Sequence, residues 1–299
     1  MPMPTDLHGR SVLAVFAHPD DESIACGGLL AWCASLGADA SLLCMTHGEL
    51  GQGAGTAGGG RRQELEAAAR ALGIGAVTLH DHEDGMLPWL SADALRSEIE
   101  AEILARQPDV VLTFDSDGLY WHPDHIALHE LTTAAVAALA DAAPALYYVT
   151  LPPGSMRAVV DHTEQLRRRH GGGENRPGMG TVDPGSPGET APHRTPTSIL
   201  GVTDPDAFGS AAPAPTLVVD AGDFAVRKLA ALACHASQFA DSALASLSER
   251  DAPRFLGVEH YRRAAAGASG RTFLDDFGCR PESSDRPDDQ RGGPIASGA

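Results

Sequence analysis

The feature that most constrains the fold is the alternation of short apolar runs with longer segments of helical periodicity. Each apolar run is rich in Val, Leu or Ala and is bounded by polar residues or glycine, which is typical of buried parallel strands. The expected strands are residues 11–17, 38–46, 76–80, 109–115, 145–151 and 216–220, and the expected helices are residues 27–37, 61–73, 91–107, 123–140 and 223–239. The alternation predicts an α/β fold with a Rossmann-like, mostly parallel sheet, helices on both faces, and a C-terminal strand–helix extension.

Composition divides the chain into segments. Residues 171–215 contain nine Gly and eight Pro with few large apolar residues, so we expect them to form a mobile insertion. Residues 1–170 are expected to form the Rossmann-like core, and residues 216–279 the C-terminal part of the same domain. The polar residues 280–299 are expected to be a disordered tail.

Charge and cysteine content narrow the class of function. The 22 Lys and Arg residues against 40 Asp and Glu residues give a net charge of −18, which disfavours nucleic-acid and anionic-membrane partners. The five cysteines show no close CxxC pairing, and the N-terminal residues carry no apolar signal segment. We therefore expect a cytoplasmic protein that acts on a small molecule, and these features are compatible with a homo-oligomer.

Two His-Pro-Asp stretches follow the first and fourth expected strands: AHPDDE at 17–22 and WHPDH at 121–125. In an open parallel sheet, ligands bind beyond the carboxyl ends of the strands where the strand order reverses, so the two stretches are expected to meet in one cleft. A lone Asp there is usually a helix cap and a lone His a hydrogen-bonded residue, but the combination favours a divalent-metal site. Two imidazoles and one carboxylate leave a fourth position open, which is the pattern of catalytic zinc.

With these motifs the sequence resembles the zinc-dependent PIG-L or LmbE-like N-deacetylases, which remove acetyl groups from N-acetylglucosamine in small molecules. The resemblance covers residues 11–150 and reappears at 228–238, KLAALACHASQ. It implies one Zn²⁺ per chain, with iron as the alternative metal, and an N-acetylglucosaminide or related amide as substrate. It places the ligands at His18, Asp21 and His125.

The resemblance also assigns the catalytic groups. Asp20 is expected to act as the general base on zinc-activated water, and His122 as the cation that stabilises the oxyanion. An amide is a poor electrophile, so its hydrolysis needs both an activated nucleophile and a stabilised oxyanion.

The substrate contacts implied by the resemblance are Glu49, Arg61 and Tyr120. Trp121 stands where the family often has a small residue, and it is expected to line or narrow the sugar pocket. Asp84 is expected to contact a sugar hydroxyl. His235 points either into the cleft or onto a half-buried helix face, and the sequence leaves both readings open.

Two other classes of function compete with the deacetylase. A dinuclear-metal phosphoesterase would need bridging carboxylates, for which Asp115 and Asp117 are available. A non-catalytic Rossmann-like binding module leaves Asp20 without a role, and the GxGxxG motif of a dinucleotide site is missing after the first strand. His80 and His82 form an H-x-H that suggests a second metal, although a solvated or substrate-facing loop is the favoured interpretation.

Overall fold

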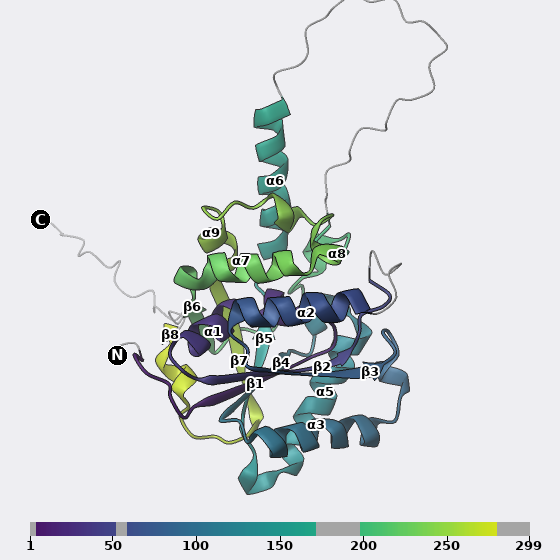
Figure 1. The fold of residues 1–299 in the computed structure, drawn as a ribbon, viewed down its shortest axis with the longest axis vertical. Coiled ribbons are helices and arrows are strands. Elements are labelled where there is room, and N and C mark those ends of the chain that lie inside the picture. Colours follow the sequence, from purple (N-terminus) through teal and green to yellow (C-terminus); the bar gives the residue numbers. More distant parts are fainter. Residues whose placement is uncertain (1–3, 52–58, 172–197, 280–299) are drawn as a thin grey trace, which may run out of the picture.

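One sheet organises the part of the chain that the computed structural model describes, residues 4–51, 59–171 and 198–279 (Figure 1). Its eight strands lie in the order β3-β2-β1-β4-β5-β7-β6-β8. Their bounds are β1 Ser11–Phe16, β2 Asp39–Thr46, β3 Ala76–His82, β4 Val110–Phe114, β5 Ala145–Thr150, β6 Leu217–Asp220, β7 Val258–Gly267 and β8 Gly278–Cys279. Strands β1 to β5 pair in parallel, and β7 joins β5 to β6 in antiparallel pairing. The predicted mostly parallel α/β fold is confirmed.

The strand order reverses between β1 and β4. Strand β1 pairs with β2 on one side and with β4 on the other, where Val12 lies opposite Val110 and Ala14 opposite Leu112. The carboxyl ends of β1 and β4 therefore reach the same edge of the sheet side by side. Both His-Pro-Asp stretches begin at that edge, as the sequence predicted.

Helices cover both faces of the sheet (Figure 1). Their bounds are α1 Asp21–Ser35, α2 Gly59–Leu72, α3 Ala92–Arg106, α4 Gly118–Trp121, α5 Pro123–Ala138, α6 Ser155–Gly171, α7 Ala225–Cys234, α8 Ala236–Phe239 and α9 Ala252–Leu256. Helices α1, α2 and α7 pack together on one face, and α3 packs on α5 on the other. None of these helices, among the residues described, is long and apolar enough to cross a membrane.

Two hydrophobic clusters fill the interior. The larger one lies between the sheet and its helices and includes the whole run Val12–Phe16, which is fully buried. The smaller one gathers residues of α6, α7 and the segment before β6, including Ile199 and Phe208. Residues 198–215, which we assigned to the Gly/Pro-rich insertion, thus contribute large apolar side chains to a folded core. Mobility of that insertion stays a prediction, and its residues 172–197 lie outside the described part, as does the expected tail at 280–299.

Strand β7 was missed from the sequence because VEHYRRAAAG mixes charged and small residues without a clear period of two. In the structure it supplies Glu259, which is almost fully buried. Helix α1 has a non-helical backbone at Cys26 (φ −144°, ψ 20°), so the N–H groups of the next residues need other acceptors. The Glu259 carboxylate accepts from the N–H of Gly28 (2.8 Å) and of Leu29 (2.9 Å), and it pairs with Lys228 Nζ at 2.6 Å. The C-terminal segment thereby completes the helix that carries the first motif.

Candidate active site

Three side chains of the two motifs converge beyond the ends of β1 and β4. His18 Nδ1 lies 3.0 Å from His125 Nε2, and the two carboxylate oxygens of Asp21 lie 3.3 Å from His125 Nε2 and 3.4 Å from His18 Nδ1. With zinc bonds of about 2.0 to 2.1 Å, neighbouring donor atoms of a tetrahedral site are about 3.3 Å apart. The two ring nitrogens and the Asp21 carboxylate therefore lie at the spacing of ligands around one ion.

The outer ring nitrogens of both histidines are held by acceptors. His125 Nδ1 lies 3.0 Å from the carbonyl oxygen of Gly118, which can only accept, so this nitrogen carries the proton. His18 Nε2 lies 3.0 Å from Asp84 Oδ1 and 3.1 Å from Asp124 Oδ2. These contacts leave the lone pairs of His125 Nε2 and His18 Nδ1 directed at the shared position, as metal-binding imidazoles require. The donor set fits a zinc ion.

Buried carboxylates around this cluster favour positive charge within it. Burial alone would lower the pKa of His18, but the carboxylates of Asp124, Asp21 and Asp84 raise it well above its ordinary value. Burial acts to raise the pKa of Asp21, but His125 and His18 outweigh it and hold this pKa far below the usual range. A site in which anions favour protonated imidazoles is one in which a divalent cation replaces those protons.

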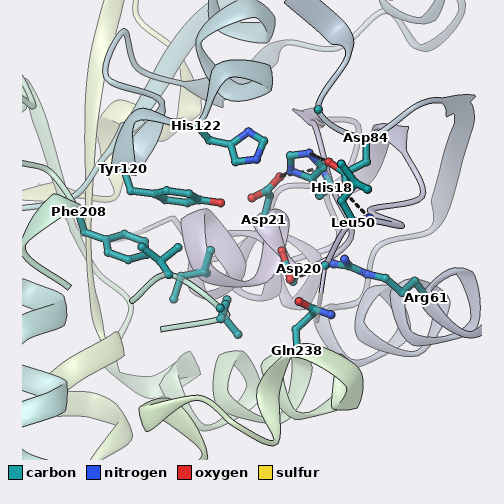
Figure 2. A pocket seen from close by; sticks show the side chains of 16 residues that line it. His18, Asp20, Asp21, Leu50, Arg61, Asp84, Tyr120, His122, Phe208 and Gln238 are labelled. Atoms are coloured by element: carbon teal, nitrogen blue, oxygen red, sulfur yellow. Dashed lines mark hydrogen bonds and ion pairs between the residues drawn. The ribbon is translucent and has the colours of Figure 1, made fainter. Parts of the chain in front are cut away.

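Asp20 lies beside the ligands but does not share their contacts. It caps α1 in a left-handed conformation (φ 118°), and its N–H donates to Glu22 Oε2 at 3.1 Å. Its Oδ2 accepts from Arg61 Nη2 at 3.1 Å, and Figure 2 shows the carboxylate facing the cavity. Burial raises the pKa of Asp20 to about 7, although the Arg61 guanidinium opposes this rise. A carboxyl group tuned in this way is suited to exchange protons near neutral pH.

His122 differs from the expected cation. Its Nδ1 accepts a hydrogen bond from the N–H of Asp124 (3.2 Å) as the N-cap of α5, so the single proton of a neutral imidazole sits on Nε2. Burial and the nearby His125 and His18 lower the pKa of His122 to about 4. Three imidazoles whose nitrogens lie within 4.8 Å of one another do not all carry charge. His122 is therefore a neutral N–H donor near pH 7, and the expectation of a cation is corrected.

A cavity of about 300 Å³ opens in front of these groups (Figure 2). One wall is polar, and its side chains are His18, Asp20, Asp21, Arg61, Asp84, His122 and Gln238. The apolar side chains of the lining, here called the apolar wall, are Ile24, Leu200, Val202 and Phe208, together with Leu50 next to Asp84. Tyr120 stands between the walls, with its ring 5.1 Å from that of His125 and 4.9 Å from that of Phe208.

Three predicted substrate contacts form a supporting framework on the polar wall. Arg61 donates to the carbonyl oxygens of Gly48 and Pro19 as well as to Asp20. Asp84 accepts from the N–H of Leu50 (2.9 Å) in addition to contacting His18. The Glu49 carboxylate in turn accepts from the N–H of Asp84 at 2.8 Å. Arg61 and Asp84 line the cavity, and Glu49 stands behind them.

Two predicted contacts are placed elsewhere. Trp121 is 53% exposed, has a left-handed backbone (φ 69°), donates from Nε1 to Ser210 Oγ (2.8 Å) and is not among the residues that line the cavity. His235 is fully buried, and its Nε2 lies 2.8 Å from Glu22 Oε1. The side chain thus lies in neither of the two places that the sequence left open, the cleft or a half-buried helix face, but in the interior.

The sequence interpretation missed Gln238 and the apolar wall. Gln238 lies in the HASQ stretch that carried the resemblance, so that stretch was the available signal. Leu200, Val202 and Phe208 belong to the Gly/Pro-rich segment, where no periodicity marked them.

The carboxylates that a dinuclear site would need are engaged elsewhere. Asp115 receives two hydrogen bonds from Arg262, at 2.8 and 2.5 Å, and Asp117 Oδ1 accepts from the N–H of Leu119. Neither side chain lines the cavity, so the phosphoesterase alternative is not supported.

Comparison with known proteins gives a consistent assignment. A family model described as PIG-L, GlcNAc-PI de-N-acetylase, matches residues 13–136. The 1D-myo-inositol 2-acetamido-2-deoxy-alpha-D-glucopyranoside deacetylase of Acidothermus cellulolyticus is 33% identical over 285 residues, covering 84% of this chain and 88% of that protein. A second relative with the same name, from Salinispora arenicola, is 30% identical and covers 89% of this chain and 88% of its own length.

Solved structures share the fold at lower identity. The N,N'-diacetylchitobiose deacetylase of Pyrococcus horikoshii has a TM-score of 0.53 at 22% identity, with 85% of this chain and 84% of that chain covered. The 4-carboxy-2-hydroxymuconate hydratase of Pseudomonas putida has a TM-score of 0.56 at 18% identity, with 88% and 99% covered. Since a deacetylase and a hydratase share this fold, the side chains at the strand ends decide the chemistry.

Proposed function

This chain belongs to the PIG-L family of de-N-acetylases, and from that premise we propose that it is a zinc-dependent hydrolase that removes the N-acetyl group from a small molecule containing N-acetylglucosamine. The observation that carries the proposal is the cluster of His18, Asp21 and His125, whose ring nitrogens lie 3.0 Å apart and 3.3 to 3.4 Å from the two Asp21 carboxylate oxygens, beside a cavity that also exposes Asp20. The chemistry of these residues, together with the family, favours hydrolysis of an amide.

The three ligands and the base have separate tasks. His18, Asp21 and His125 would hold a zinc ion, which would lower the pKa of a water molecule and polarise the acetyl carbonyl. Asp20 takes the proton of the attacking water and delivers it to the leaving amine. Two hydrogen bonds hold Asp20 in place: Arg61 donates to its carboxylate, and the Asp20 N–H donates to the Glu22 carboxylate. Asp124 and Asp84 keep His18 in the tautomer that binds the metal.

His122 completes the reaction centre. Its Nε2–H faces the cavity as a fixed hydrogen-bond donor, and it stabilises the amide oxygen as that oxygen gains charge. One such donor typically contributes about 100- to 1000-fold in rate. Figure 2 shows the hydroxyl end of Tyr120 directed toward Asp21 and the cavity, where it is available to the same oxygen or to the leaving group.

The two walls suit a sugar conjugate. Arg61, Asp84 and Gln238 offer charged and amide groups for hydroxyls, with Glu49 positioning Asp84 through its N–H. Ile24, Leu200, Val202 and Phe208 offer an apolar surface for the carbon faces of the sugar or of its partner group. Most of the polar wall comes from the family-matched residues 13–136, whereas most of the apolar wall comes from residues 198–208. We therefore assign the acetamide to the polar wall and selectivity for the attached group to the apolar wall.

The test is release of free amine and acetate from 1D-myo-inositol 2-acetamido-2-deoxy-α-D-glucopyranoside, the compound in the name of the relatives, and from a panel of other N-acetylglucosamine conjugates. The protein is stripped of metal, and separate samples are reloaded with zinc and with iron. We expect at least one conjugate to yield acetate and amine in equal amounts. Absence of acetate from every conjugate with either metal contradicts the proposal. Cytoplasmic location and homo-oligomerisation stay predictions.

A further inference from the structure

A second group of metal-binding side chains lies on the edge strand of the sheet. His80 and His82 are on β3, which continues to His82 and pairs there with Thr46, so the H-x-H is on a strand and not on the loop that we expected. The register of β3 against β2 shifts between Leu79 and His82, so the strand is irregular there. Both imidazoles nevertheless contact Glu98 of helix α3.

The three side chains converge on one oxygen atom. Glu98 Oε2 lies 2.9 Å from His80 Nδ1 and 2.6 Å from His82 Nε2. One donor atom of each residue lies within 4.8 Å of the others. Within the described residues, the two further clusters of this kind both contain His18, and this cluster shares no residue with them. It is therefore separate from the candidate active site.

This arrangement differs from an ordinary histidine–carboxylate pair. His162 faces one carboxylate, with its Nε2 3.1 Å from Asp251 Oδ1. At the edge cluster two imidazoles are aimed at the same carboxylate oxygen. Two imidazoles with one carboxylate are a protein donor set that suits zinc.

The solvent exposure of these three side chains and the fixed position of β3 against α3 also suit a cation. The side chains of His80, His82 and Glu98 are 26%, 23% and 34% exposed, so an ion reaches them from solvent and retains water at its remaining position. One turn along α3, Glu102 accepts from Thr78 Oγ1 of the same strand at 2.9 Å, which holds strand and helix in register without the ion. The donors are thereby prepositioned on rigid elements.

We propose that His80, His82 and Glu98 form a second divalent-cation site, selective for zinc-type ions, which joins β3 to α3 on the outside of the sheet. The proposal does not rest on the proposed deacetylase function, because no residue of the active site takes part. Greater exposure and the absence of a supporting carboxylate shell like that around His18 make it weaker than the buried site.

The experiment measures bound zinc per chain by equilibrium dialysis over a range of free zinc concentrations, using the whole protein. We expect the wild-type protein to bind two equivalents in two steps and the His80→Asn/His82→Asn double variant to lose the weaker step. His162→Asn, which alters a histidine facing a single carboxylate, is the matched control and should keep both steps. Glu98→Gln, which retains an acceptor for both imidazoles, should weaken the second step at least tenfold and covers the case in which the double variant fails to fold.

The outcomes separate the two sites. If Asp21→Asn loses the tighter step while the edge variants lose the weaker one, both sites are as assigned. If Asp21→Asn changes nothing but the edge variants lose one equivalent, the second site stands and the active-site assignment fails. If the double variant and Glu98→Gln both bind zinc as the wild-type protein does, the second site is refuted.

Discussion

The buried cluster at the end of β1 and the exposed cluster on β3 contain almost the same donor groups in very different surroundings. His18, Asp21 and His125 are 8%, 4% and 0% exposed in their side chains, against 23% to 34% for the edge cluster. The buried cluster is backed by Asp84 and Asp124 and shares a cavity with Asp20 and His122. The difference teaches that the same donor types can stand in two settings, and that burial, a neighbouring carboxylate with a raised pKa and a cavity are what favour a reaction centre at the first.

The largest expected effect is loss of the buried metal. Asp21→Asn replaces a charged ligand by a poor one, so zinc affinity and amide hydrolysis should fall together, with activity reduced to background. Chelation of the wild-type protein should do the same, and added zinc should restore it. Glu98→Gln, the equivalent change in the edge cluster, should keep activity. Full turnover in metal-free protein would contradict the prediction that activity depends on metal at the buried cluster and not at the edge cluster.

Removing the base should slow the reaction without releasing the metal. Asp20→Asn keeps the size of the side chain but cannot accept the proton of water, so we expect a loss of about 100- to 10,000-fold in kcat. Zinc content, measured on the same preparation, should stay at the wild-type level. If Asp20→Asn loses zinc while Asp21→Asn keeps it, the two roles must be exchanged.

A smaller loss is expected at His122. His122→Phe keeps a ring but removes the Nε2–H donor, and kcat should fall by about 100- to 1000-fold with zinc still bound. His129→Phe is the control, since His129 caps no helix and its Nδ1 contacts the carbonyl of Phe114 outside the cavity wall. Equal losses in both variants would indicate a packing effect in place of a catalytic one.

The smallest effect concerns stability at the edge cluster without metal. The folded-state pKa of Glu98 lies below its ordinary value of 4.5, so its contribution is fully present above pH 4.5 and is lost as the pH falls through the folded-state value. Because these groups are partly exposed, Glu98→Gln should lower the free energy of unfolding by only about 0.2 to 1 kcal/mol at pH 7. Urea unfolding with chelator present, at pH 7 and in the acid range, measures the difference in free energy of unfolding between the wild-type protein and Glu98→Gln. This difference should shrink as the pH falls, and a difference that grows in acid would contradict the prediction.

The sequence was sufficient where the determinants are local. Alternating apolar runs predicted the parallel sheet, and the two His-Pro-Asp stretches predicted which side chains meet at its edge, because strand ends impose that meeting. The failures all involve distant or conformational determinants. Trp121 has a left-handed backbone and donates to Ser210, which is 89 residues away along the chain. His235 contacts Glu22, which is 213 residues away. No local pattern shows that Leu200 and Phe208 of a Gly/Pro-rich segment form one wall of the cavity.

The contact of Glu259 with helix α1 has a consequence for how the protein is made. The AHPDDE motif occurs near the start of the chain, yet the acceptor for the N–H groups of Gly28 and Leu29 is not synthesised until residue 259. During translation the family-matched segment leaves the ribosome with its metal ligands present but with this helix incomplete at its kink. Breaking the buried Lys228–Glu259 pair at 2.6 Å is expected to cost about 3 to 5 kcal/mol, so a nascent chain that lacks β7 forgoes a comparable stabilisation. The helix that begins at Asp21 is accordingly expected to reach its final stability only after the C-terminal strand has docked.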